Sequence, residues 1–94
     1  DRLVVFAALW HPSSKPFIEK ARNWANENDK PLEVISLDWN VDQARREAEL
    51  LNLSEQTLFA GPGQLSLDAQ WPLSNGRGAF LIDASGRISA RPLD

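Results

Sequence analysis

The sequence predicts one small α/β domain with a mixed β-sheet. Two apolar runs, 3–9 and 32–37, are each followed by a segment in which apolar residues recur at helical spacing. A third apolar run, 79–83, is followed across a short turn by an alternating segment, 87–91, which is typical of a β-hairpin. This order predicts two parallel strands joined by a helix, to which the hairpin adds antiparallel strands.

The run 3–9 is continuously apolar, as expected of a strand buried on both faces. A helix is expected over 14–28, with Ser13 or Ser14 as its N-cap and Pro31 marking its end. The apolar residues at helical spacing, which predict the buried face of this helix, are Phe17, Ile18, Ala21, Trp24 and Ala25.

The second strand leads into a second helix that begins near Asn40 or Asp42. Asn40 and Gln43 have the spacing of a capping box, and Asn52 suits the C-terminal cap. A short extended piece at 57–60 is expected before the hairpin. The buried stripe of this helix is predicted to contain Val41, Ala44, Ala48 and Leu51.

Composition limits the classes of function. The 94 residues suffice for a single domain, 1–94, and the absence of an initial Met indicates a piece of a longer or processed protein. The chain has no Cys and one His, so we expect no transition-metal site and no cofactor. The net charge of −3 is well mixed, so nucleic acid is not an expected partner. The first apolar run is too short to span a membrane, which needs about 20 apolar residues, so we expect no membrane insertion by this chain.

Three segments carry a resemblance to a known family. They are 4–10 (VVFAALW), 34–39 (VISLDW) and 80–88 (FLIDASGRI). In these segments and in its element order, the chain resembles thioredoxin-like proteins of the TlpA/ResA type, which are thiol–disulfide oxidoreductases. The resemblance implies a three-layer fold with a β-α-β-α-β-β core and a periplasmic or extracytoplasmic location. The helix that usually ends this fold is absent here or lies outside the chain.

The chain departs from the family at its redox motif. Where the family has Trp-Cys-x-x-Cys, this chain has His11 and Ser14 at the two cysteine positions. Without a thiolate, a dithiol–disulfide cycle is impossible for this chain alone, so we expect no catalytic residue and no enzyme activity. The hydroxyl of Ser14 is expected to cap the helix instead. The position that the family gives to a cis-proline falls near Arg77.

We therefore expect a degenerate thioredoxin-like domain that serves protein interaction or architecture, with a protein or a neighbouring domain as its partner. The alternative is a divergent oxidoreductase relative whose redox-linked role depends on the cysteines of a partner or neighbouring domain. The candidate binding edge comprises the former active-site residues Trp10, His11, Pro12, Ser13 and Ser14, together with Arg77.

Plainer roles compete with this hypothesis. His11 can be a polar residue that fills a dead redox site, and Arg77 a solvated loop arginine. Trp24 lies on the apolar stripe of its helix, and packing is also the favoured role for Trp39 and Trp71, which lie at the ends of elements. A buried acid often lies near the redox site of the family enzymes. The pattern does not place Asp38 or Asp83, both at strand ends, in that role.

Overall fold

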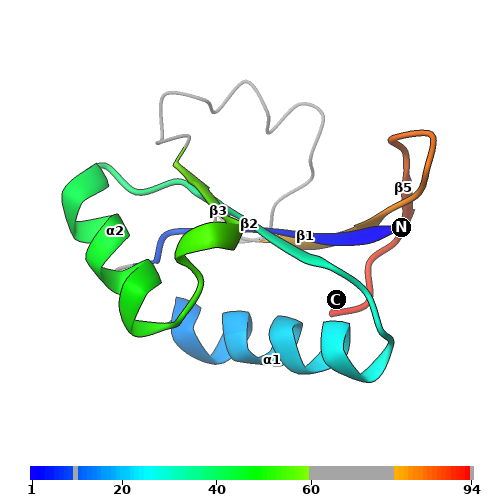
Figure 1. Cartoon of the computed structure of the whole chain (residues 1–94), viewed down its shortest axis with the longest axis horizontal. Coiled ribbons are helices and arrows are strands. Elements are labelled where there is room, and N and C mark those ends of the chain that lie inside the picture. The colour runs from blue at the N-terminus through cyan, green and yellow to red at the C-terminus, as the bar shows by residue number, and fades with distance from the viewer. Residues whose placement is uncertain (10, 60–77, 94) are drawn as a thin grey trace.

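A five-stranded mixed sheet forms the centre of the molecule (Figure 1). The computed structural model describes residues 1–9, 11–59 and 78–93. The strands follow the order β3-β2-β1-β4-β5. Their bounds are Arg2–Ala7 for β1, Leu32–Ser36 for β2, Thr57–Phe59 for β3, Gly78–Ile82 for β4 and Ile88–Ala90 for β5. The helices are α1 (Ser14–Glu27), α2 (Val41–Leu50) and the short 3-10 helix η1 (Ser54–Gln56).

Strand β1 pairs in opposite senses on its two sides. It runs parallel to β2, with Leu3 opposite Leu32, and antiparallel to β4, with Leu3 opposite Leu81. The strands β4 and β5 form the expected hairpin, and β3 adds a short parallel strand outside β2. The predicted α/β class with a mixed sheet is therefore confirmed, and the extended piece expected at 57–60 is β3.

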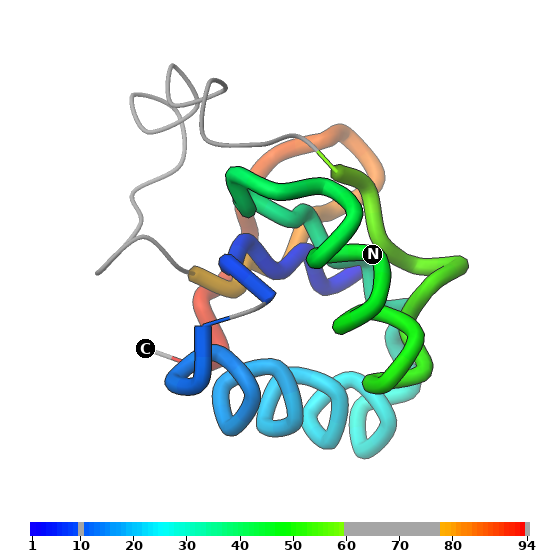
Figure 2. The backbone as a smooth tube through the Cα atoms, turned by 90° about the vertical axis from the view of Figure 1, so that its left-hand side faces the viewer, coloured from blue at the N-terminus to red at the C-terminus, as the bar shows by residue number. Residues whose placement is uncertain are grey.

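Alternate residues of β1 face opposite sides of the sheet. One side faces α1, where strand and helix residues bury each other in one apolar cluster that includes Leu3, Val5, Ile18 and Ala21. The C-terminal residues run toward α1 (Figure 2), and Leu93 packs against this cluster. No helix is found among 91–93, the described residues that follow β5.

The other side of the sheet departs from the three-layer expectation. Its apolar cluster contains Val4, Phe6, Phe80 and Ile82, and the rings of Phe6 and Phe80 meet edge to face with centroids 5.9 Å apart. No helix residue belongs to this cluster in the described part of the chain. Helix α2 lies instead beside β3, at the end of the sheet where β2 finishes (Figure 1).

Both helices end in a Schellman motif built on a residue other than glycine. After α1, Asp29 takes a φ of 53°, and the N–H of Lys30 donates to the Ala25 carbonyl at 2.8 Å. After α2, Asn52 takes a φ of 60°, and the N–H of Leu53 donates to the Ala48 carbonyl at 2.8 Å. Asn52 therefore ends α2 as predicted, one position beyond the C-cap.

The start of α2 is also as predicted. The N-cap is Asn40, whose side-chain oxygen accepts the backbone N–H of Gln43 at 3.0 Å. Of the expected stripe, Ala44 and Ala48 are fully buried, Leu51 is half-buried and Val41 is exposed.

Candidate functional site

The ends of β1 and β2 lie side by side, and β1 leads toward the turn that precedes α1. Ala7 is opposite Ser36 in the parallel register, and the N–H of Leu37 donates to the Ala7 carbonyl at 3.0 Å. Residues 8–9, which follow β1, and residues 37–40, which follow β2, therefore leave the sheet at the same edge. We call the described residues 11–14, together with Asp38 and Trp39, the β1–β2 edge.

Asp38 is the buried anchor of this edge. Its side-chain oxygen accepts the backbone N–H of Leu9 at 2.9 Å and also accepts the hydroxyl of Ser36. Asp38 is only 2% exposed, and a carboxylate so far from water needs such donors. The contact explains why β1 ends at Ala7 rather than at Leu9: beyond Ala7, a side chain of the neighbouring segment takes the place of the ladder partner.

His11 and Ser13 form the polar turn that precedes α1. The Nδ1 atom of His11 accepts the backbone N–H of Ser13 at 3.2 Å, and the Ser13 hydroxyl lies 2.7 Å from the same nitrogen. Because a backbone N–H can only donate, Nδ1 is an acceptor here, which places the ring proton of a neutral His11 on Nε2.

The expectation that the side chain of Ser13 or Ser14 caps α1 is wrong. Ser13 occupies the N-cap position, but its side chain makes no capping hydrogen bond because the hydroxyl is directed to His11. Ser14 is the first residue of α1 and is buried, and its backbone N–H donates to the His11 carbonyl at 2.9 Å. Ser14 therefore begins α1 as a buried residue and not as its N-cap.

A hydrolytic role does not follow from the His11–Ser13 contact. Nucleophilic catalysis by serine requires a site shielded from water, with donors aimed at an oxyanion. Both residues are exposed, and the nitrogen that would act as base already accepts a backbone N–H. The contact shapes the turn before α1.

Trp39 is the large apolar side chain of the β1–β2 edge. The prediction that it packs against the fold is wrong. It is 84% exposed, directly after Asp38, which is 2% exposed. Val34, Ser36 and Asp38 are all buried, so Trp39 falls in the opposite phase. Ile35 and Leu37 share that phase and pack against the cluster of Phe6 and Phe80, so alternation alone does not predict the exposure of Trp39. By contrast, Trp24 packs against the α1-side core as expected.

Other predicted residues lie elsewhere. Trp10, Trp71 and Arg77 lie outside the described residues. Asp83 follows the strand residue that pairs with Arg2, so it belongs to the end of the sheet far from His11. Its side-chain oxygen accepts the Ser85 hydroxyl at 2.6 Å and the Arg87 N–H at 3.1 Å, and these hydrogen bonds lower the pKa of Asp83.

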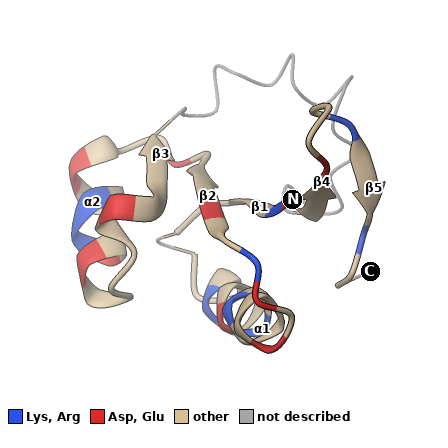
Figure 3. Ribbon diagram, turned by 45° about the vertical axis from the view of Figure 1, so that its right-hand side comes forward, with Lys and Arg blue, Asp and Glu red and all other residues tan. Residues whose placement is uncertain are grey.

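The described ranges contain no group of three His, Cys, Asp or Glu residues that could hold a metal ion. Within the same ranges, none of the helices has the length and apolar character needed to cross a membrane. Acidic and basic residues both occur on α1 and on α2 (Figure 3). No family model, no curated protein and no solved structure matches this chain.

Proposed function

We propose that this chain is a non-catalytic thioredoxin-like domain that binds a protein partner through the β1–β2 edge. The observation that carries the proposal is the exposure of Trp39 directly beside the buried Asp38. Tryptophan supplies a large contact area and is enriched among the residues that dominate binding energy at interfaces. The anchor below it fixes the backbone from which the side chain extends.

The topology supports the thioredoxin-like part of the proposal. The unit β1-α1-β2 is parallel, and β4 and β5 add an antiparallel hairpin on the other side of β1. These are the parts that a β-α-β-α-β-β core requires. Residues 11–14 lie between β1 and the first turn of α1, where a thioredoxin-like domain would carry its redox motif, and this supports the proposal.

The edge combines a fixed base with accessible groups. Asp38, Ser36 and Ser14 are buried, whereas His11, Pro12 and the other residues of the turn are exposed. A rigid base limits the loss of conformational entropy when a partner binds. The exposed indole of Trp39 and the exposed imidazole of His11 offer such a partner an apolar contact and a hydrogen-bonding group.

The test is capture of partners from a native extract on the immobilised domain. We expect Trp39→Ser, and a double variant with His11→Ala and Arg77→Ala, to lose a partner that the unaltered chain retains. Leu50→Ser is the matched control, because Leu50 is 77% exposed but lies on α2. Equal capture by all four proteins would exclude the edge as the binding surface. Capture that is abolished by alkylating the thiols of the extract would favour the redox-linked alternative.

A further inference from the structure

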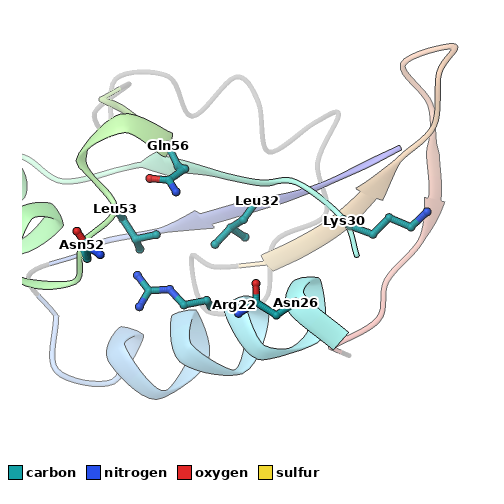
Figure 4. Close-up of a pocket in the computed structure, with 7 residues that line it drawn as sticks. All are labelled: Arg22, Asn26, Lys30, Leu32, Asn52, Leu53 and Gln56. Carbon is teal, nitrogen blue, oxygen red and sulfur yellow. The ribbon is translucent and has the colours of Figure 1, made fainter. Parts of the chain in front are cut away.

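A second candidate site lies between α1 and the segment that follows α2. A cavity of about 300 Å³ opens there (Figure 4). Two leucines, Leu32 and Leu53, give it an apolar wall, and Leu53 is almost fully buried. The remaining lining residues are cationic or carry a carboxamide: Arg22, Lys30, Asn26, Asn52 and Gln56. We call this site the Arg22 cavity.

The charge of this lining is opposite to that of the chain. Acidic residues outnumber basic ones by 13 to 10 in the whole sequence, but no lining residue is acidic. The ion pairs found among the described residues join Arg2 to Glu33 and Lys15 to Glu47, so neither includes Arg22. A half-buried guanidinium that pairs with no carboxylate of the described residues favours an anionic ligand beside it.

Arg22 is held in position rather than free to extend into solvent. Its Nη2 atom donates to the backbone carbonyl of Leu51, the C-cap of α2. A guanidinium carries five N–H donors, so this contact leaves donors for a ligand. In Figure 4 the guanidinium is directed toward Asn52 and Leu53, whereas the ammonium of Lys30 is directed away from the other labelled residues. Lys30 therefore contributes its aliphatic stem.

The carboxamides complete the arrangement. Asn26 comes from the last turns of α1, Asn52 is fixed by its left-handed backbone, and Gln56 ends η1. Each carboxamide supplies two N–H donors and one acceptor oxygen. Three carbonyls at the ends of the two helices already have donors: those of Ala25 and Ala48 accept the Schellman hydrogen bonds, and that of Leu51 accepts Arg22.

We propose that the Arg22 cavity binds the oxyanion of a small polar ligand. The group is a carboxylate or a phosphate, which Arg22 contacts with its remaining donors and the carboxamides contact from the sides. The cavity lies at the second half of α1, whereas the β1–β2 edge lies at the N-terminal end of α1 and just beyond β2, so the two proposals stand or fall separately.

The test is a titration followed by nuclear magnetic resonance, observing the Nε–H of Arg22 and the side-chain amides of Asn26, Asn52 and Gln56. Sodium phosphate and sodium malonate are added separately at constant ionic strength. We expect saturable shifts at these groups with one or both anions, and the anion that gives them identifies the oxyanion. Absence of saturation with both anions would overturn the proposal.

Two variants make the test specific. Arg22→Gln removes the guanidinium, and Gln56→Glu places a carboxylate in the lining while leaving the contact between Arg22 and Leu51 intact. Each should weaken binding at least tenfold. Arg46→Gln is the matched control, because Arg46 is an exposed arginine of α2 outside the lining. Saturable shifts that persist unchanged in both test variants, or that disappear in the control, would contradict the assignment.

Discussion

The carboxylate of Asp38 binds the backbone N–H of Leu9 at 2.9 Å, across 29 positions of sequence. This contact joins the two parallel strands just beyond their last ladder pair, at the point where the chain turns toward α1. It couples the position of Leu9, just after β1, to the segment that follows β2. The shape of the proposed binding edge therefore depends on one buried side chain.

Replacing Asp38 should destabilise the fold. Asp38→Ala leaves the Leu9 N–H and the Ser36 hydroxyl without this acceptor in a buried place, and we expect a loss of about 3 kcal/mol in the free energy of unfolding. Asp38→Asn keeps an acceptor oxygen and should lose less. Urea denaturation followed by circular dichroism measures both. Equal losses for the two variants would show that the charge, rather than the acceptor, stabilises this edge.

Substitutions of the exposed Trp39 and the half-buried Trp24 should have different effects on the stability of the fold. Trp39→Ser should change the free energy of unfolding by less than about 0.5 kcal/mol, because the indole makes little contact with the fold. Trp24→Ala should lower the free energy of unfolding by about 3 kcal/mol, because Trp24 packs against the apolar cluster between α1 and the sheet. Thermal and urea denaturation measure both changes. A large loss for Trp39→Ser would mean that Trp39 supports the fold rather than a partner.

The strained end of α1 offers a stabilising substitution. Asp29 has a φ of 53° and an acidic side chain at the negative end of the helix dipole. Asp29→Gly relieves both effects and should raise the free energy of unfolding by about 1 kcal/mol. Asp29→Asn is the control, because it removes the charge and keeps the Cβ atom. If Asp29→Asn gives the whole gain, backbone strain contributes nothing.

Asp83 should make the hairpin sensitive to acid. The carboxylate of Asp83 accepts a hydrogen bond from the Ser85 side chain and another from the backbone N–H of Arg87. The Ser85 hydrogen bond has the larger effect, and both hold the pKa of Asp83 below the usual value of 3.8. Because the folded state favours the ionised form, this stabilisation is complete above the pKa of the unfolded chain and is lost as the pH falls through the lower, folded pKa. Asp83→Asn should therefore lose less stability than the unaltered chain on acidification below about pH 4. Thermal denaturation across this range, in both proteins, measures the difference.

The fold class followed from periodicity because the apolar runs and helical stripes each match one kind of element. The capping role of Asn40 followed equally well, since its spacing to Gln43 is a local property of the chain. The placement of α2 beside β3 did not follow, because a stripe of apolar residues shows which face is buried and not what buries it. Both Ala44 and Ala48 are buried as expected.

The candidate site was less predictable from sequence. The contact of Asp38 with Leu9 depends on the register of two parallel strands, which no local pattern specifies. Ser13 had two partners within reach, the helix N–H groups and His11, and the backbone at 11–13 decided between them. The exposure of Trp39 did not follow from strand alternation, because Ile35 and Leu37 have the same phase and pack against an apolar cluster.

The two-sided pairing of β1 also has a consequence for biosynthesis. One edge of β1 pairs with β2, which follows soon after it in sequence, whereas the other pairs Leu3 with Leu81. During translation, β1-α1-β2 can assemble while the second edge of β1 still lacks its neighbour. Until β4 leaves the ribosome, that apolar edge remains open to strands of other nascent chains. Slowing synthesis before residue 78 should therefore increase aggregation of the emerging chain and its dependence on chaperones.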